Sequence, residues 1–473
     1  MGPVTIWPAS RREEKVQGKE TAGCVPLGFN PINTHTHFHT APRNNPHHAT
    51  LRKGFHPLSP KRGHVTIAHQ LRKTFIVFST VCLGILLLLL LLNIGGWRAR
   101  ISSRLRRVNN APTLVSPPAN FQPQVPPGFH VSVFATGFQQ PRWLAIAPNG
   151  DVFVADSAAG EVVVLEDHQQ SGKAANRSVF ADHLTLPFGI AFHDNFVYVA
   201  NTNQVVRFPF DPNTSKRLGD AEPILDLPGL GYNQHWTRSL AFSNDGTRLF
   251  VSVGSQTNVS IESDPRRAAV LVADPDGKNM QVYASGLRNA VGIAFQNGQL
   301  WATVNERDDL GDDVPSDYFT HITVGGFYGW PYSYLGPHVD DRVAPRPDLV
   351  SRAIVPDLLL GAHVAPLQLA FYEARQFLAP YQHGAFVAEH GSWNRHTRSG
   401  YQVVLIPFRD GAPSGGPSPF LSGFVPDPTG AEVYGRPVGV AVDANGSLLV
   451  SDDGQKLIWR VSYEPAQAAG SHS

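Results

Sequence analysis

Cysteine is scarce in this chain of 473 residues, and both cysteines, Cys24 and Cys82, precede the part that has the pattern of a folded domain. That domain is therefore expected to hold no disulfide and no thiol nucleophile. It also has no Cys-x-x-Cys-His, which excludes covalently attached haem. Net charge is small, +1 at pH 7, so composition gives no electrostatic argument for nucleic acid as a partner. Gly and Pro are plentiful, as a turn-rich β fold requires.

Apolar periodicity is missing at the N-terminus. Residues 1–64 are rich in Pro, His, Arg and Asn, which predicts a disordered segment. His35, His37 and His39 are available metal ligands there but have no structured surroundings. A second hypothesis is that translation begins near Val65, so that this segment is not made. Detecting peptides upstream of Val65 in the purified protein would contradict it.

A long apolar run follows. Phe75 to Leu92 carries no charge, and over residues 71–96 the run is long enough to cross a hydrocarbon core. The alternative, a buried helix, is disfavoured because no amphipathic face exists. The next residues, Trp97-Arg-Ala-Arg100, are charged, so we expect an uncleaved transmembrane anchor rather than a removed signal peptide. Counting basic residues alone would place the following domain on the inner, cytoplasmic side of the membrane.

Three further segments complete the predicted organisation. Residues 97–127 are first basic and then Pro-rich, which predicts an extended linker. Residues 128–465 form the expected folded domain. Residues 466–473 are small and polar, and we expect a disordered tail.

Within the folded domain, a strand–turn–strand pattern occurs six times. In the first copy, Asn149-Gly150 supplies the turn between two apolar strands. The copies begin roughly 45 to 75 residues apart, the spacing of four-stranded propeller blades with loop insertions. The sequence therefore predicts an all-β fold, a six-bladed β-propeller. The copies cover residues 144–156, 189–201, 239–252, 292–305, 369–389 and 439–452.

Polar residues flank these hairpins. A hairpin enters and leaves on one side, so the flanking residues share one face of the disc, at the mouth of the central channel. We predict a site there made of cations, carboxylates and imidazole. The plain alternative is that these residues only cap strands and neutralise one another. The flanking residues include Arg142, Phe188, His235, Arg238, Arg288, Asn289, Gln368 and Arg436 before the hairpins, and Asp156, Asn201, Glu306, Asp308, Asp309, Glu389, His390, Asp452 and Asp453 after them.

Three of these groups have chemistry of their own. At such a rim His235 is expected to titrate near neutrality and to accept a proton, although a lone His is often structural. The acidic run from Asn305 to Asp313 offers hard oxygen ligands suited to calcium, with an exposed acidic turn as the alternative. Arg288 and Asn289 suit a ligand bearing carboxylates or a quinone, with strand capping as the alternative.

Together these segments resemble a known family. His235-x-x-Arg-x-Leu-Ala-Phe, Gly286-Leu-Arg-Asn289, Asn305-Glu-Arg-Asp308 and Gly325-Gly-Phe-Tyr-Gly-Trp-Pro331 occur in that order. From about Gly128 to Pro465 the chain resembles the glucose/sorbosone dehydrogenases, six-bladed propellers that use pyrroloquinoline quinone (PQQ) and calcium. Two further motifs, Glu389-His-Gly-Ser-Trp-Asn-Arg395 and Gly435-Arg-Pro-Val-Gly-Val-Ala441, resemble the sorbosone and pyranose dehydrogenase branch.

The resemblance implies a PQQ- and calcium-dependent sugar dehydrogenase with its propeller in the periplasm or another extracytoplasmic space, and the apolar run adds the expectation that it is membrane-anchored. His235 matches the general base, which takes the sugar hydroxyl proton as hydride passes to the quinone. Arg288 and Asn289 match the pair at the cofactor and its reactive carbonyl, which makes Arg288 a second catalytic candidate, and Arg436 matches a residue that pairs with the cofactor's carboxylates. Arg238 lies in the same lead-in as His235.

Other positions carry over less directly. The turn containing Asp308 and Asp309 matches the loop whose backbone carbonyls bind the cofactor-associated calcium. His390 and Trp393 stand where glucose-oxidising members place a Lys, which departs from the family pattern. Arg142 is added from hairpin geometry. Since no haem motif is present, we expect an external electron acceptor, a quinone or a cytochrome.

Two other functions stay open at this point. A calcium-dependent lactone hydrolase on a similar propeller would use side-chain oxygens converging on an ion at the axis, and Asp452, Glu389 and Asn201 are candidates. A non-catalytic propeller that binds a partner at its rim would need no convergence of Arg and His on one mouth.

Overall fold

The computed structural model describes residues 70–87, 107–229 and 235–464. The segments predicted to be disordered, 1–64 and 466–473, lie outside the described residues. The chain divides near Leu91 into an N-terminal unit and a larger C-terminal unit, and each is described by itself.

The N-terminal unit contains an apolar helix, Gln70–Leu87. Its side chains are exposed throughout, including Phe75, Phe78 and Cys82. Eighteen helical residues extend about 27 Å, close to the thickness of a hydrocarbon core. Within the described parts of the chain, this is the one helix long and apolar enough to cross a membrane. It falls on the predicted span, of which residues 88–96 lie outside the described part.

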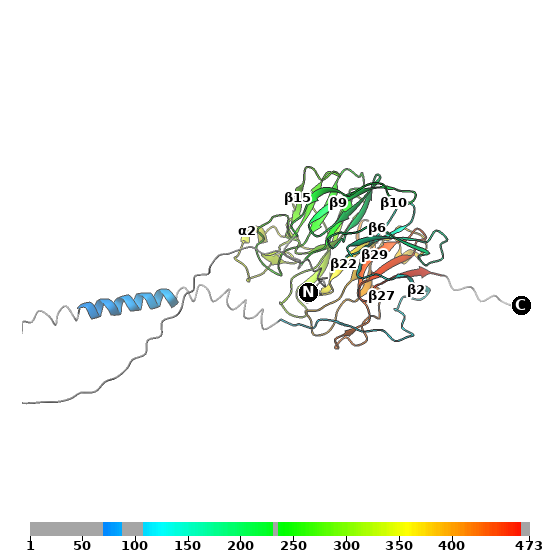
Figure 1. Ribbon diagram of the computed structural model, residues 1–473. Coiled ribbons are helices and arrows are strands. Elements are labelled where there is room, and N and C mark those ends of the chain that lie inside the picture. Colours follow the sequence, from blue (N-terminus) through cyan, green and yellow to red (C-terminus); the bar gives the residue numbers. More distant parts are fainter. Residues whose placement is uncertain (1–69, 88–106, 230–234, 465–473) are drawn as a thin grey trace, which may run out of the picture. The chain divides into compact units, whose positions relative to one another are not determined.

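The C-terminal unit is a six-bladed β-propeller, as predicted, and Figure 1 shows its strands gathered in one β-rich domain. Each repeated sequence pattern forms the two inner strands of one blade. Written from the axis outward, the first blade is β3 (Pro141–Ile146), β4 (Val152–Asp156), β5 (Glu161–Glu166) and β6 (Asn176–Ala181). The second is β7 (Ile190–His193), β8 (Phe196–Ala200), β9 (Gln204–Asp211) and β11 (Glu222–Asp226), with β10 (Lys216–Arg217) also on β9.

The next blades follow the same order. The third is β12 (Arg238–Phe242), β13 (Leu249–Val253), β14 (Ala269–Ala273) and β15 (Gln281–Ser285). The fourth is β16 (Ala290–Gln296), β17 (Gln299–Val304), β18 (Ser316–His321) and β21 (Leu358–Ala362). The fifth is β22 (Pro366–Phe371), β23 (Ala385–Glu389), β24 (Gln402–Ile406) and β27 (Ser418–Leu421).

The last blade joins the two ends of the propeller. It consists of β29 (Pro437–Val442), β30 (Leu448–Asp452), β31 (Leu457–Tyr463) and the N-terminal strand β2 (Phe129–Thr136). β2 pairs antiparallel with β31, from Phe129 opposite Tyr463 to Thr136 opposite Leu457. The ring therefore closes non-covalently.

Short elements lie in the connections. They are β1 (Thr113–Leu114), β19 (Ser333–Tyr334), β20 (His338–Val339), α2 (Pro347–Val350), a 3₁₀ turn (Ala379–Tyr381), β25 (Phe408–Arg409), β26 (Ala412–Pro413) and β28 (Glu432–Val433).

Burial falls from the axis outward. All residues of β4, β13, β23 and β30 are buried, because the second strand of a blade packs against neighbouring blades on both faces. Most residues of the outermost strands β6, β11 and β15 are exposed or half-buried. Apolar clusters between adjacent blades make up the core.

Three glycines let the inner strands approach closely. One equivalent position of the innermost hairpin strand is occupied by glycine in every second blade, at Gly189, Gly292 and Gly439, and by a larger residue in the other three blades. A Cβ atom would lie 2.7 Å from a backbone oxygen of the next blade at Gly189, and 2.3 Å at Gly292 and at Gly439. Only glycine fits such an approach without displacing backbone.

Hydroxyl groups complete two of these close contacts. Thr303 donates to the Leu367 carbonyl and accepts from the Gly292 N–H. Ser451 does the same between Arg142 and Gly439. These hydrogen bonds join inner strands of different blades and fix their relative height.

The predicted linker is packed on the propeller over part of its length. β1 pairs in parallel with β28, Gln124 forms a bridge with Ser422, and the Asn110 N–H donates to the Trp393 carbonyl at 2.8 Å. The segment from about residue 108 onward is thus held by the fifth and sixth blades rather than running free.

We predict that Gly439→Ala destabilises the propeller by about 1–3 kcal/mol, because the added methyl overpacks against the Arg142 backbone. Differential scanning calorimetry should show a lower Tm. Gly416→Ala is the control, since a Cβ there meets no atom within 4 Å and is expected to leave Tm unchanged. Equal Tm values for the two variants would contradict the close-approach argument.

Candidate active site

Some of the predicted mouth residues act as strand caps. Asp156 accepts hydrogen bonds from the backbone N–H groups of Gln139 and Gln140, at 2.9 and 2.6 Å. Asn201 accepts from the Thr185 N–H, and Asp452 accepts from the N–H of Arg436 at 2.8 Å. In each of these three blades, the residue at the end of the second strand fixes the lead-in to the first. The plain alternative explains these positions.

A second group forms a buried network of charges. Arg142 donates to one carboxylate oxygen of Asp453, and His390 Nε2 lies 2.9 Å from the other. Arg436 donates to the His390 carbonyl at 3.2 Å. The first, fifth and sixth blades thus place two guanidinium groups and one imidazole around a single carboxylate.

Burial governs the protonation of this network. Burial, together with the charge of Arg436, lowers the pKa of His390 to about 4, so its ring is neutral at pH 7. Burial opposes ionisation of Asp453, but His390 and Arg142 hold its pKa below the usual range. Asp453 is therefore a carboxylate that balances part of the positive charge of Arg142 and Arg436.

Aromatic rings line the same place. The guanidinium carbon of Arg142 lies 5.5 Å from the ring centre of Phe188 and 5.4 Å from that of Trp236. Arg436 lies 5.7 Å from the ring centre of Tyr401. Flat rings beside fixed cations suit a planar anionic ligand.

His235 is buried, with 2% of its surface exposed. Its Nδ1 lies 2.8 Å from the Ser255 carbonyl, which fixes that nitrogen as the N–H donor and leaves Nε2 as the basic nitrogen. Nε2 is buried and has no hydrogen-bond partner among the described residues. Burial, reinforced by the charge of Arg288, lowers the pKa of His235 well below its usual range. The ring is a neutral acceptor at pH 7.

Asn289 and His235 both lie close to Gly254. A Cβ atom added at Gly254 would fall 2.5 Å from the His235 Cβ and 2.3 Å from the Asn289 Oδ1. That oxygen is also buried without a partner in the described part of the chain. Two unsatisfied polar atoms on neighbouring residues cost stability unless a ligand engages them.

Two predicted cofactor contacts instead brace the protein. All five N–H donors of Arg288 are used: on Asn258 twice, on the carbonyls of Asn305 and Glu306, and on the Asp308 carboxylate at 3.0 Å. Arg238 donates to the carbonyl of His235 at 2.7 Å. Direct cofactor contact by either arginine stays a prediction.

The acidic turn is held by arginines as well. Arg307 is fully buried between the Glu306 and Asp340 carboxylates, each at 2.9 Å. The Asp308 carbonyl accepts hydrogen bonds from Asn258 and from Arg342. Donors pointed at this carbonyl leave it poorly suited to a cation.

The two remaining positions lie beside this turn. The Asp309 N–H donates to Asn394 at 2.9 Å, and the Asp309 carboxylate lies 3.9 Å from Arg107. Trp393 is partly buried next to Asn394. Calcium ligation by Asp308 and Asp309 and cofactor contact by Trp393 stay predictions.

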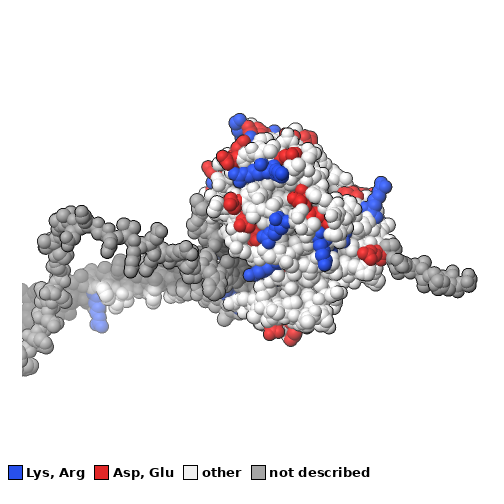
Figure 2. Space-filling view, turned by 45° about the vertical axis from the view of Figure 1, so that its right-hand side comes forward, with Lys and Arg blue, Asp and Glu red and all other residues white. Residues whose placement is uncertain are grey.

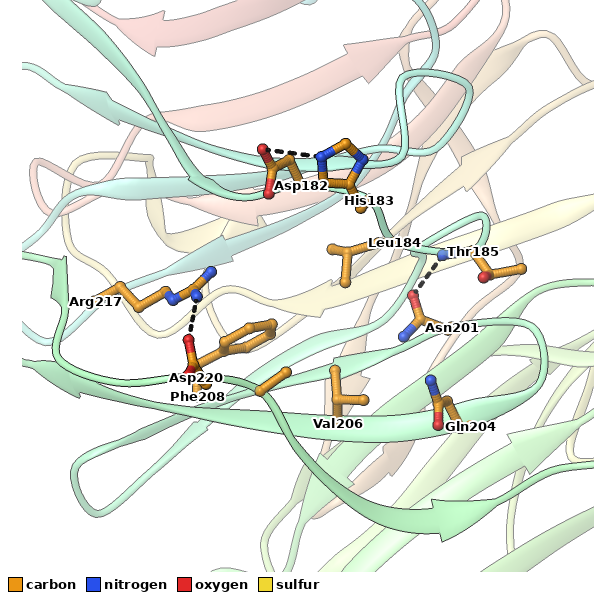
Figure 3. Close-up of a pocket in the computed structure, with 11 residues that line it drawn as sticks. Asp182, His183, Leu184, Thr185, Asn201, Gln204, Val206, Phe208, Arg217 and Asp220 are labelled. Atoms are coloured by element: carbon orange, nitrogen blue, oxygen red, sulfur yellow. Dashed lines mark hydrogen bonds and ion pairs between the residues drawn. The ribbon is translucent and has the colours of Figure 1, made fainter. Parts of the chain in front are cut away.

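One hollow is lined largely by residues of the second blade and of the connection that leads into it. It has a volume of about 390 Å³ and lies where the β6–β7 connection meets β9, with Asp182, His183, Asn201, Phe208 and Arg217 in its wall (Figure 3).

On the face shown in Figure 2, cationic and anionic side chains alternate without an extended patch of one sign.

Sequence reasoning missed Asn258, which connects the parts of the site. It lies between β13 and β14, and its Oδ1 accepts from Arg288 and from the Asp308 N–H, while its carbonyl accepts from Arg288 and Trp330. A lone Asn in a polar loop carries no sequence signal. Trp330, which donates to the Asn258 carbonyl, belongs to the Gly-Trp-Pro motif, so the sequence indicated only one of the two partners in this contact.

The family of the chain follows from comparison with known proteins. A family model described as TrAA12-like matches residues 123–318 and 350–464, nearly the whole propeller. The chain belongs to the TrAA12-like family.

Its relatives agree with that assignment. An uncharacterized protein of Borreliella burgdorferi is 28% identical over 72% of this chain and 91% of its own length. A pyrroloquinoline quinone-dependent pyranose dehydrogenase of Coprinopsis cinerea is 24% identical over 62% of this chain. The match spans 46% of that enzyme's length.

Solved structures with the same fold include two from fungi. The calcium structure of the Trichoderma reesei family AA12 enzyme has a TM-score of 0.63 at 22% identity, covering 74% of this TrAA12-like chain and 98% of the other. The holo PQQ domain of the Coprinopsis cinerea pyranose dehydrogenase has a TM-score of 0.61, also at 22% identity, covering 74% and 99%. The predicted family resemblance is confirmed.

One prediction concerns Glu389, at the end of β23. One of its carboxylate oxygens is buried without a partner, and burial raises its pKa to about 8, above the usual 4.5. Between these values the unfolded chain is ionised and the folded chain is protonated, so stability falls as pH rises from 4.5 to 8. Glu389→Gln removes this loss and should raise Tm at pH 8 but not at pH 4.5.

Glu373→Gln is the matched control, because that side chain is about half exposed and solvated in both states. Tm of each variant and of the parent is measured from pH 4.5 to 9. A Glu389→Gln gain that does not grow with pH would contradict the burial argument.

Proposed function

We propose that this protein is a PQQ- and calcium-dependent sugar dehydrogenase in which His235 is the general base. The observation that carries the proposal is the buried Nε2 of His235, which has no hydrogen-bond partner among the described residues, at a mouth rich in arginine. The names of the fungal relative and of the structural neighbours support the reaction class.

In the proposed reaction, the sugar CH–OH loses a proton and a hydride. His235 takes the proton at Nε2, because Nδ1 already donates to the Ser255 carbonyl. Its lowered pKa keeps the imidazole free of a proton at pH 7. When bound, PQQ supplies the two-electron acceptor for the hydride. Arg238 holds the base in place through its carbonyl.

The residues present fit a tricarboxylate quinone. Arg142 has a buried Nε without a partner among the described residues, and Arg436 is partly buried beside it, so both have capacity for carboxylate oxygens. Asn289 would contact the reactive end, near His235. His390 and Trp393 would form part of the wall, and Arg288 would act mainly by holding the loops together.

The proposal includes calcium as a bound ion, but no step of the proposed reaction is derived from it. Asp308 and Asp309 are the proposed ligand region, but the Asp308 carbonyl accepts from Asn258 and Arg342 in this arrangement. Calcium binding there would require Arg342 to turn away.

The cellular setting completes the proposal. We place the helix Gln70–Leu87 in a membrane as an anchor, with the propeller on the extracytoplasmic or periplasmic side. The substrate is a pyranose, an aldose or a sorbosone-type sugar, and the electrons leave through an external quinone or cytochrome. The domain limits stay as proposed from the sequence: 71–96, 97–127 and 128–465.

A lactone hydrolase receives no such support. Asp452 accepts three N–H donors as a strand cap, Asn201 caps Thr185 and faces the hollow of Figure 3, and Glu389 bonds to Gln402. Asp452 and Asn201 are thus engaged as strand caps, and one oxygen of Glu389 is bonded to Gln402.

We predict that His235→Ala lowers kcat by about 10²- to 10⁴-fold, because the proton acceptor is lost. The assay uses the full chain in detergent, loaded with PQQ and calcium, and follows dye reduction with a panel of pyranoses and sorbosone. His235→Gln preserves the volume of the buried site. His321→Ala, which removes a partly exposed imidazole on an outer strand, is the control and should keep parental kcat.

Full activity of both His235 variants would exclude this residue as the base. Failure of the parent chain to bind PQQ at saturating calcium would overturn the dehydrogenase proposal itself.

We also predict that Arg142→Met and Arg436→Met each weaken PQQ binding about tenfold or more, since each loses a charge-assisted hydrogen bond in a buried place. Fluorescence titration with PQQ measures Kd, in the presence and absence of calcium. Arg248→Met is the control, because Arg248 is half exposed and pairs with Asp274. An unchanged Kd in both mouth variants would contradict the proposed carboxylate contacts.

A further inference from the structure

A second polar cluster lies at the other end of the first blade. Asp151 stands between the Asn149-Gly150 turn and β4, Glu166 is the last residue of β5, and His168 follows it. β4 pairs antiparallel with β5 with Val152 opposite Leu165, so the three residues meet at the turn end of the blade. Asp156, which ends β4 on the mouth side, is at the opposite end of that strand.

Asp151 is buried with half of its carboxylate unsatisfied. Its exposed fraction is 2%, and its Oδ2 accepts from Asn149 at 2.7 Å and from Ser215 of the second blade at 2.6 Å. Its Oδ1 is buried and has no hydrogen-bond partner in the described chain. A buried oxygen that carries charge and has no donor is expected to have a ligand.

The imidazole of His168 faces the carboxylates of Asp151 and Glu166, but it lies too far from either for a hydrogen bond. His168 Nε2 lies 3.7 Å from Asp151 Oδ1 and 3.7 Å from Glu166 Oε2, beyond hydrogen-bond range. Among the described residues, no Lys or Arg forms an ion pair with either carboxylate. The three ligand atoms all lie within 4.8 Å of one another.

The loop that carries His168 is already shaped. The two carboxylate oxygens of Asp167 accept the N–H groups of Ser171 and Gly172, each at 2.8 Å, and the Asp167 carbonyl accepts from Gln170. Asn176 donates to the same Glu166 oxygen that faces His168. Binding an ion would require little reordering of backbone.

We propose that Asp151, Glu166 and His168 form a binding site for a divalent transition metal of the zinc class. Zinc bonds of about 2.0–2.2 Å give a ligand–ligand edge of roughly 3.4 Å in a tetrahedron, close to the two 3.7 Å separations. The imidazole favours zinc over calcium or magnesium, which prefer ligand sets made of oxygen alone. Water would complete the coordination.

Such an ion would be structural. It would neutralise the buried carboxylate of Asp151 and clamp the β3–β4 turn to the end of β5. Through Ser215, which bonds to the same carboxylate, it would also stiffen the contact between the first and second blades. The site is independent of the proposed dehydrogenase reaction and of its cofactors.

The test uses the full chain in detergent, prepared without a polyhistidine tag and with His35, His37 and His39 replaced by Ala, so that zinc bound near the N-terminus does not count. Zinc content after dialysis is measured by mass spectrometry, and Tm is measured with zinc and with chelator. We expect one zinc per chain and a Tm several degrees higher with zinc. Cobalt substitution should give the intense visible absorption of a tetrahedral site.

His168→Ala and Asp151→Asn should each lose the zinc and the zinc-dependent Tm shift. His168 is largely exposed, so its loss should not impair folding. His383→Ala is the control, since that imidazole faces a single carboxylate, Glu373. Zinc content that is unchanged in His168→Ala, or the absence of zinc and of a Tm shift in the parent, would overturn the proposal.

Discussion

Closure of the ring is the constraint on which this structure depends. Six sheets must meet around one axis. At some positions the strands nearest that axis approach one another too closely to leave space for a side chain. Gly189, Gly292 and Gly439 provide backbone contact in three blades, and pairing of β2 with β31 joins the ends. Since each second strand is then buried on both faces, the charged residues that follow these strands are carried into the interior at one end of the channel.

Those buried charges divide into two kinds. Arg288 uses all five of its N–H donors, and Arg307 lies between two carboxylates, so both charges are stabilised by their partners. His235 Nε2, Asn289 Oδ1 and Arg142 Nε are equally buried and lack partners among the described residues. Unsatisfied groups reduce stability, so a ligand that supplied partners to these three atoms would gain binding free energy. Asp151 has the same property at the other end of the first blade.

Much of the fold was open to prediction from sequence. Each hairpin is local, with alternating apolar residues and turns such as Asn149-Gly150, so all six pairs of inner strands were found. The site was predictable in composition but less so in roles. Asp156 and Asp452 were grouped with reactive residues, although each caps a neighbouring strand. Asn258 was missed, because its importance comes from partners 30 to 72 positions away.

The sequence by itself determined the repeated hairpins, the blade number, the apolar helix and the identity of the groups gathered at the mouth. These follow from period-two patterning and short loops, which act within one hairpin. Only the tertiary structure decided which groups are satisfied and which are left free. Hydrogen-bond partners come from different blades, and burial depends on all six, so the basic nitrogen of His235, the bracing by Arg288 and the open carboxylate of Asp151 are properties of the closed ring.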